Sequence, residues 1–536
     1  MEITIREERA AHAAVSAVER LVADGVPGRL AAGDPTLWGE EAEAEAATRL
    51  GWLSLPRTSR ELLPEIAELV AWAAAEELTN VVLAGTGGSS LAAEVVCDSA
   101  DVPLTVLDTT DSQQVRRALA EGLAHTVLVV ASKSGETVET GSVLRIFEAA
   151  FQDAGIDPAT RIVIVTDPGS PLAPAAADAG YRLVLARPDV GGRYSALSAF
   201  GLVPSALAGV PVERLLDEAA EVAPLLSRPE GNPGLLLGAV IGGSALAGRD
   251  KLVLEDQLSE LNGLPVWIEQ LLAESTGKDG RGILPVVGAD PSGVGDELVL
   301  AIASDIGDVR VDGPLGAQFL VWEYATAVVG RLLEVNPFDQ PDVASAKRAT
   351  AALLVSPHEP NEPVLVDGPV EVYGSTSAHD LPGVYSELLH AVPHDGYLAV
   401  LAYLDRLAAF DAPVPDGADF VEMTDAWMAA DAATLRALLA LRTPRPVTFG
   451  WGPRYLHSTG QYHKGGPPTG VFLQITGVVQ DDVPVPGRSY TLRSLQLAQA
   501  LGDLTALTEL GRPAVRLHLT DRAAGVAHLL AAAQEA

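Results

Sequence analysis

Two segments of this sequence combine glycine with hydroxyl side chains where a predicted strand meets a predicted helix. GTGGSS, at residues 85–90, follows the apolar run NVVLA, and ASKSGETVET, at residues 131–140, follows HTVLVV. Glycine leaves backbone amides accessible and the hydroxyls donate further hydrogen bonds, so such turns suit an anion such as a phosphate group. Taken alone, GTGGSS could also be a tight turn or hold a dinucleotide, although it lacks the third glycine of the dinucleotide fingerprint.

The second segment places several phosphate-binding groups close together. Ser132, Ser134 and Thr137 could surround one phosphate, and Lys133 would add positive charge. Helix N-capping explains one such hydroxyl but not the cluster. Because parallel strands present ligands at their carboxyl ends, we expect both segments to lie at one edge of a sheet. Their candidate binding residues also include, from the first segment, Gly88 and Ser89.

Arg193 and Glu274 are candidates for acid–base chemistry. Arg193 follows the glycine pair of VGGRYS, where Gly192 lets the backbone approach a ligand, so its guanidinium could stabilise an oxyanion. Glu274 lies in EQLLAESTGK at the predicted end of a helix, where the helix dipole disfavours a carboxylate and raises its basicity. That suits a general base, although a surface glutamate is the more frequent explanation for one such residue.

The elements that must position these residues follow an alternating pattern. Apolar strands and helical stretches alternate over residues 80–190, which predicts a doubly wound α/β unit with a mainly parallel sheet flanked by helices. A second α/β unit begins near residue 232, and the strands PVTFGWG, GVFLQITG and AVRLHL are expected to complete its sheet. The predicted division is a helical segment at 1–60, a first domain at 61–230, a second domain at 231–349 and 441–536, and a mostly helical insertion at 350–440.

The amino-acid composition limits which molecules the protein can bind and which compartment it suits. The 536 residues carry 71 acidic and 36 basic side chains, a net charge of -35, which repels nucleic acid and anionic membranes alike. A single cysteine excludes an intrachain disulfide and a multi-cysteine zinc site, so a reducing compartment is expected. The charged, amphipathic start of the chain lacks a signal-peptide core, which predicts a cytoplasmic protein.

In their order along the chain, the motifs closely resemble the phosphoglucose isomerase family. The resemblance covers most of residues 80–347, through GTGGSS, SKSGETVET, VGGRYSALSAFG, QLLAESTGK and NPFDQPDVASAK, and resumes near 447. It implies paired sugar isomerase (SIS) domains and the interconversion of glucose 6-phosphate and fructose 6-phosphate through a cis-enediolate, without metal or cofactor. It further implies that Glu274 is the base, Arg193 stabilises the enediolate, Lys347 acts near the ring-opening end of the sugar, and Gln270 and Gln340 line the sugar site.

The histidine motif of this family lies at a different position in this sequence. In bacterial relatives it follows the glutamate motif by a few tens of residues, but no histidine lies between Glu274 and Lys347. The segment YLHSTGQYH resembles the family's histidine segment and implies that His457 opens the sugar ring, with His463 as the alternative. This order of motifs is similar to the isomerase half of transaldolase fusion proteins.

Two other functions remain open from the sequence. One is a dual phosphoglucose and phosphomannose isomerase, which would use the same base. The other is a non-catalytic sugar-phosphate-binding partner of transaldolase, which would need the phosphate-binding segments but not Glu274. The resemblance also implies a homodimer, in which relatives commonly donate the histidine across the interface.

Overall fold

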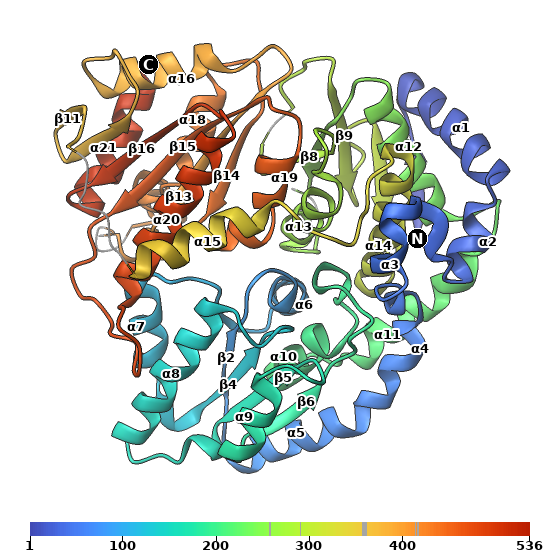
Figure 1. Cartoon of the computed structure of the whole chain (residues 1–536), viewed down its shortest axis with the longest axis horizontal. Coiled ribbons are helices and arrows are strands. Elements are labelled where there is room, and N and C mark those ends of the chain that lie inside the picture. Colours follow the sequence, from blue (N-terminus) through green and yellow to red (C-terminus); the bar gives the residue numbers. More distant parts are fainter. Residues whose placement is uncertain (257–258, 290, 356–361, 413, 415–417) are drawn as a thin grey trace.

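The computed structural model describes residues 1–256, 259–289, 291–355, 362–412, 414 and 418–536. Its strands form three sheets, and Figure 1 shows the three units built on them gathered around a common centre. The predicted fold class, α/β with mainly parallel sheets flanked by helices, is confirmed. None of the helices in these ranges has the length and apolar content that crossing a bilayer requires.

The first unit has a parallel five-stranded sheet in the order β3-β2-β4-β5-β6. Its strands are β2 (Asn80–Ala84), β3 (Thr105–Leu107), β4 (Thr126–Ala131), β5 (Ile162–Thr166) and β6 (Arg182–Leu185). Its helices are α5 (Leu63–Ala75), α6 (Leu91–Ser99), α7 (Ser112–Ala120), α8 (Val138–Asp153), α9 (Leu172–Ala179) and α10 (Ala199–Ala208).

The central strands of this sheet are mostly apolar because helices cover both faces. Alternate residues point to opposite faces, so Leu83 and Val129 join one hydrophobic core with α5, α6 and α10. Val82 and Val130 join another core with α7 and α8. Continuous burial of β4 therefore reflects a parallel sheet between two helical layers.

The second unit has the sheet order β1-β10-β9-β7-β8. Its strands are β1 (Glu2–Ile5), β7 (Lys251–Glu255), β8 (Leu284–Val287), β9 (Glu297–Ile302) and β10 (Val309–Asp312), parallel except for β1. Its main helices are α1 (Glu8–Ala23), α11 (Glu213–Val222), α12 (Pro233–Leu246), α13 (Leu264–Thr276) and α14 (Leu315–Leu333), and the short helices α2 (Val26–Ala31), α3 (Glu40–Ala46) and α4 (Leu55–Thr58) lie nearby. The start of the chain is thus not purely helical, because β1 pairs with β10.

The third unit has the sheet order β11-β12-β16-β15-β13-β14. Its strands are β11 (Leu365–Asp367), β12 (Val370–Gly374), β13 (Tyr397–Tyr403), β14 (Val447–Trp451), β15 (Gly470–Gly477) and β16 (Ala514–Leu519), of which the last four run parallel. Its helices are α15 (Val343–Val355), α16 (Leu381–Ala391), α17 (Phe420–Ala430), α18 (Thr434–Ala440), α19 (Gly460–Gly465), α20 (Leu492–Glu509) and α21 (Arg522–Glu535).

This third sheet corrects the expectation that the last three strands complete the second sheet. They pair instead around β13, which comes from the region predicted to be mostly helical. The β13 sequence YLAVLAY is rich in Leu and Ala, which favour helices in isolation. Pairing with β14 and β15 on its two sides buries all seven residues, so tertiary contacts override that preference.

The three units meet at the loops that follow their strands. The 3₁₀ turn η4 (Gly87–Ser89), after β2, contacts both η7 (Gly192–Tyr194), after β6, and η10 (Arg454–His457), after β14. Helix α13 of the second unit contacts η7 as well. Residues far apart in the sequence are thereby brought to one centre, as expected for ligands at the carboxyl ends of parallel strands.

Candidate active site

The loop between β4 and α8 gathers the predicted hydroxyl groups. The Ser132 and Thr137 hydroxyl oxygens lie 3.1 Å apart, and Ser132 Oγ also accepts a hydrogen bond from the Gly135 amide at 3.1 Å. Ser134 Oγ accepts one from the amide of Glu136 at 3.2 Å. The loop ends at the amino terminus of the 16-residue helix α8, whose dipole favours an anion there.

Lys133 of the same loop is already engaged. Its ammonium forms an ion pair with Asp167 and donates a hydrogen bond to the Arg187 carbonyl at 3.3 Å. Burial lowers the pKa of Lys133, and the contact with Asp167 partly offsets this effect. Because Asp167 balances the Lys133 charge, the hydroxyls and amides are the groups of this loop that remain to bind an anion.

The glycine-rich turns η4 and η7 touch each other directly. A Cβ atom on Gly88 would lie 2.1 Å from the Gly192 carbonyl oxygen, so a side chain there would force the two turns apart. Ser195 Oγ holds the turns together, since it donates to the carbonyls of both Gly88 and Gly192. Ser89 is half-buried in η4, at the start of α6.

Arg193 is fixed from several sides. Its Nε donates to Ser275 Oγ at 2.8 Å, its Nη1 to Gln340 Oε1 at 3.0 Å, and its Nη2 to the carbonyls of Pro337 and Asp339 at 2.9 and 2.8 Å. Its side chain is only 4% exposed. A guanidinium held this rigidly can stabilise developing negative charge without first reorganising.

Glu274 lies in the last turn of α13, as its sequence predicts, and its carboxylate faces Arg193. Glu274 Oε1 is 3.1 Å from Arg193 Nη1, and Glu274 Oε2 accepts a hydrogen bond from Gln270 Nε2 at 3.1 Å. The same Gln270 nitrogen donates to the His457 carbonyl oxygen at 2.8 Å. Gln270 therefore joins the predicted base to the turn that carries the predicted histidine.

His457 pairs with a carboxylate that the sequence interpretation missed. His457 Nε2 lies 2.9 Å from Glu139 Oε1, which also accepts a hydrogen bond from Gln499 Nε2 at 2.7 Å. Burial acts to raise the pKa of Glu139, but the charge and hydrogen bond of His457, together with the charge of Lys347, outweigh it and lower that pKa. Glu139 therefore holds the ring by Nε2, which leaves Nδ1 to exchange a proton with a ligand.

A sequence signal for Glu139 does exist. On α8 it precedes Val143 by four residues and Ile146 by seven, which places it on the face that packs into the core. A carboxylate on that buried face needs a hydrogen-bond donor or a cation as its partner, because burying an unpaired charge is energetically costly. The partner, His457, lies 318 positions away in the sequence and could not be named from the helix pattern.

A cavity of about 470 Å³ joins the hydroxyl loop to His457. Its polar walls include Ser134, Thr137, Lys347, His457 and Lys464. Lys347 projects from α15 and is exposed, whereas Lys464 is buried and pairs with Asp503 at 2.5 Å. The volume lies in the range typical of small-molecule sites. Glu274 is not among the residues lining this cavity, and Gln270 connects the two groups.

His463, the alternative to His457, occupies a different environment. It is 3% exposed, and its Nδ1 lies 2.8 Å from the Tyr397 hydroxyl. Burial, helped by the nearby charges of Lys464 and Arg512, lowers the pKa of His463 to about 3. A histidine that stays neutral and does not line the cavity is a core residue, so this environment favours His457 over His463.

The burial of His463 predicts how the stability of the folded protein changes with pH. In the unfolded chain the His463 ring is protonated below about pH 6.5, whereas in the folded chain it is protonated only near pH 3. The contribution of neutral His463 to the free energy of unfolding is therefore fully present above pH 6.5 and is lost as the pH falls from 6.5 toward 3. Between pH 6.5 and 5, urea unfolding should show a loss of stability about 2 kcal/mol larger in the wild type than in His463→Gln. The exposed His394→Gln is the control and should keep the wild-type slope; equal slopes for all three would contradict the prediction.

Within the described residues, no group of three or more His, Cys, Asp or Glu side chains is arranged to hold a metal ion. The polar groups of the site are instead hydroxyls, amides, two carboxylates and several cations. A general base beside a fixed guanidinium suits proton abstraction next to a carbonyl. The hydroxyl loop would hold an anionic group of the same substrate.

Comparison with known proteins points to one family. A family model described as phosphoglucose isomerase matches residues 65–282. A probable glucose-6-phosphate isomerase of Haloarcula marismortui is 31% identical over 343 residues, covering 51% of this chain and 78% of the relative. A glucose-6-phosphate isomerase of Cyanothece sp. is 36% identical over 216 residues, but the match covers only 38% of this chain and 40% of that protein. Among solved structures, a hypothetical protein from Thermus thermophilus has a TM-score of 0.56 at 24% identity, covering 66% of this chain and all of that one.

Fold and site together define the class of protein: an α/β protein in which a carboxylate faces a fixed guanidinium and a loop of hydroxyl groups lies nearby. The extent of the Haloarcula match identifies it further: the chain belongs to the phosphoglucose isomerase family. The predicted family is thereby confirmed. The family model ends at residue 282, before Gln340, Lys347 and His457, so the roles of these three residues rest on geometry and motif resemblance.

Proposed function

We propose that this protein catalyses the reversible isomerisation of glucose 6-phosphate and fructose 6-phosphate. The observation that carries the proposal is the continuous chain of contacts from Arg193 through Glu274 and Gln270 to His457. This chain ends beside the hydroxyl loop, because His457 binds Glu139 in the first turn of α8. The names of the relatives, which are glucose-6-phosphate isomerases, support the same substrate.

In the proposed binding mode, the phosphate rests on the hydroxyls of Ser132, Ser134 and Thr137 and on nearby amides. These groups lie away from the reacting carbons, so they contribute binding energy that holds C1 and C2 against Glu274. Gly88, Ser89 and Gly192 frame the same region through the contact of their turns. Gln340 would position Arg193 as well as contact the sugar.

In the proposed mechanism, His457 transfers a proton to the ring oxygen through Nδ1, the bond between that oxygen and C1 breaks, and the C1 hydroxyl gives its proton to water, so that the ring opens to the aldehyde. Lys347 acts near the same end of the sugar. The Glu274 carboxylate then removes the C2 proton, and the C2–H electrons form the C1–C2 double bond of a cis-enediolate. Arg193 stabilises the negative oxygen. Glu274 returns the proton to C1, the O2 proton is transferred to O1, and the ketose forms with its carbonyl group at C2. No step requires a metal or cofactor.

A coupled assay tests the function directly. The purified protein should convert fructose 6-phosphate to glucose 6-phosphate, detected by a dehydrogenase that reduces NADP, and pre-treatment with a chelator should leave the rate unchanged. A rate indistinguishable from a protein-free blank would refute the proposal and favour the non-catalytic, transaldolase-associated alternative. Mannose 6-phosphate in the same assay, with fructose 6-phosphate as the detected product, separates the dual isomerase from the strict one.

We further propose that the first and second sheets correspond to the paired SIS domains and that the protein acts in the cytoplasm. The third unit supplies His457 to the other two within a single chain. We therefore propose that each active site is complete in one subunit, even if the protein is a homodimer.

A further inference from the structure

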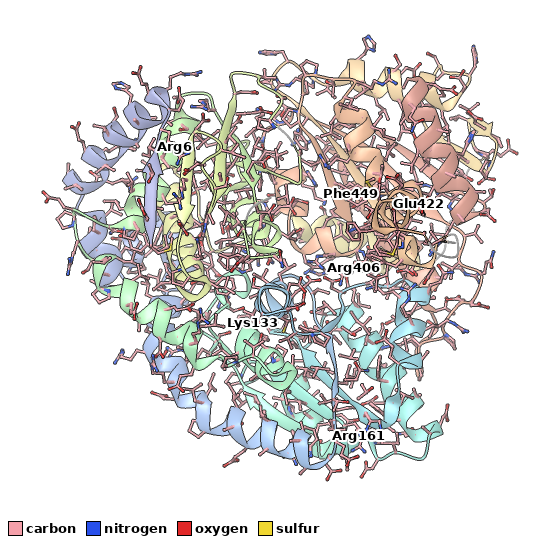
Figure 2. All side chains as sticks on the ribbon, turned by 180° about the vertical axis from the view of Figure 1, so that it is seen from behind. Arg6, Lys133, Arg161, Arg406, Glu422 and Phe449 are labelled. Carbon is pink, nitrogen blue, oxygen red and sulfur yellow. The ribbon has the colours of Figure 1, made fainter. Side chains whose placement is uncertain are left out.

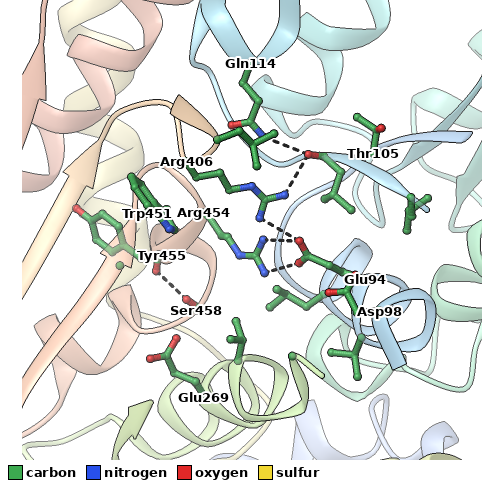
Figure 3. Close-up of a pocket in the computed structure, with 18 of the residues that line it drawn as sticks. Glu94, Asp98, Thr105, Gln114, Glu269, Arg406, Trp451, Arg454, Tyr455 and Ser458 are labelled. Carbon is green, nitrogen blue, oxygen red and sulfur yellow. Dashed lines mark hydrogen bonds and ion pairs between the residues drawn. The ribbon is translucent and has the colours of Figure 1, made fainter. Parts of the chain in front are cut away.

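A second cavity, of about 600 Å³, lies on the other side of the turn that carries His457. Its walls come from all three units: α6 and α7 of the first, α13 and β8 of the second, and β14 with η10 of the third (Figure 3). It shares no lining residue with the cavity that contains His457. The proposed isomerisation makes no use of this space, so its lining has to be explained separately.

The cations of this second cavity are already neutralised by carboxylates. Glu94 accepts hydrogen bonds from both Arg406 and Arg454 (Figure 3). Arg454 also lies 3.0 Å from Asp108. Although burial alone would raise it, the pKa of Glu94 is lowered to about 2 by Arg454 and Arg406. Arg117, at the rim, pairs with Asp405 and Asp411. An anionic ligand would therefore have to displace existing ion pairs.

Glu269 is in the opposite situation. Figure 3 shows its carboxyl group reaching into the cavity from α13. Among the described residues, none forms a hydrogen bond or ion pair with it that would balance a negative charge, and Arg454 acts on it only through its field. Burial raises the pKa of Glu269 to about 8. Asp98, on α6, also has a raised pKa, through burial and the neighbouring charge of Glu94.

The remaining walls suit an apolar body. Phe449 and Trp451 of β14 pack edge to face with ring centroids 4.8 Å apart and both line the cavity. Aliphatic side chains complete the walls, among them Val95, Leu104 and Val287. Aromatic faces attract organic cations as well as apolar groups. The net charge of -35 also raises the local concentration of cations over that of anions.

We propose that this second cavity binds an organic ammonium ligand, with the ammonium group at the Glu269 carboxylate and an apolar body against Phe449 and Trp451. The cation supplies the partner that Glu269 lacks, while the paired arginines stay in place. A neutral ligand of the same shape would fill the cavity but leave Glu269 without a counter-charge. This proposal does not depend on the isomerase activity.

Binding should also depend on pH. The charged groups that share the cavity with Glu269 are Glu94, Asp98 and Glu121, balanced by Arg117, Arg406 and Arg454. Near pH 7 the free Glu269 is mostly protonated, so an ammonium ion must displace that proton in order to bind. The affinity should therefore increase by roughly 25-fold between pH 6.5 and 8.5, a range over which a primary amine stays charged.

Isothermal titration calorimetry with phenethylammonium tests the proposal, and phenethyl alcohol serves as the neutral probe of matched shape. We expect saturable binding of one phenethylammonium per chain, at least 10-fold weaker binding of the alcohol, and at least a 10-fold loss of ammonium affinity in Glu269→Gln. Glu509→Gln, at an exposed position, is the matched control and should bind like the wild type. Trp451→Phe, which keeps an aromatic face, should bind more tightly than Trp451→Ala.

Thermal unfolding of each variant shows whether it is folded before the titration is interpreted. The proposal is overturned if phenethylammonium does not saturate the protein below about 10 mM, if the alcohol binds equally well, or if Glu269→Gln binds like the wild type. The readout is heat of binding, so the result stands whether or not the protein is an isomerase. Running the titration on a Glu274→Gln background gives the same answer in a protein without the proposed base.

Discussion

Glu274→Gln should lower isomerase turnover by roughly 10²- to 10⁴-fold, the range typical for loss of a general base. The amide cannot take the C2 proton, yet it keeps the size of the side chain and a carbonyl oxygen that can face Arg193. Substrate affinity should change little, because the hydroxyl loop lies on a different element. The coupled assay gives turnover, and calorimetry with glucose 6-phosphate gives affinity.

Glu221→Gln is the matched control for this substitution, since it makes the same chemical change at an exposed position on α11. It should retain wild-type turnover. A second readout is exchange of the C2 hydrogen with deuterated water, followed by proton NMR, which should be lost in Glu274→Gln. Turnover close to that of the wild type in Glu274→Gln would remove the basis for the proposed mechanism.

His457→Gln should lose ring opening, the other large expected effect. Turnover from cyclic glucose 6-phosphate should fall by about 10²-fold or more, because general acid catalysis at the ring oxygen is lost. Exchange between the two pyranose anomers requires ring opening but no proton transfer at carbon. NMR exchange spectroscopy should therefore find anomer exchange slowed in His457→Gln and retained in Glu274→Gln.

This pair of variants separates the two proposed roles. If both variants retained anomer exchange, His457 would not open the ring; if both lost it, the pattern would indicate a general loss of binding. His463→Gln is the control from the same segment, since its ring is buried against Tyr397 and does not line the cavity. It should keep anomer exchange wherever it remains folded.

Mixing the two inactive variants tests whether the site lies within one chain. If dimers donate the histidine across their interface, hybrids of His457→Gln and Glu274→Gln would contain one intact site, and mixing would restore up to about a quarter of wild-type activity. The contacts of His457 with Glu139 and Gln270 of its own chain lead us to expect no restoration. Unfolding and refolding the mixture together ensures that subunits exchange.

The local chemistry of the site could be read from the sequence, because it depends on neighbouring residues. Ser132, Ser134 and Thr137 lie within six positions of one another at a strand–helix junction, and the structure keeps them in one loop. Glu274 likewise lies where its helix pattern predicts, in the last turn of α13. Alternating apolar segments also identified the first α/β unit and its parallel sheet.

Contacts between distant segments could not be read in this way. Glu139 was overlooked because its partner, His457, is 318 positions away, and Lys133 was expected at the phosphate although Asp167 holds it. The strand β13 was missed because Leu and Ala give no strand signal until β14 and β15 bury it on both sides.

Spacing along the chain was therefore enough to predict the fold class and the composition of the hydroxyl loop, and the resemblance of the motifs pointed to the family. The three-dimensional arrangement was needed to show that the last strands form a third sheet, that η10 brings His457 to Glu139, and that a second cavity lies behind that turn. The physical reason is that burial and charge pairing join side chains that are far apart in the sequence, and the secondary-structure propensity of a short segment carries no information about such contacts.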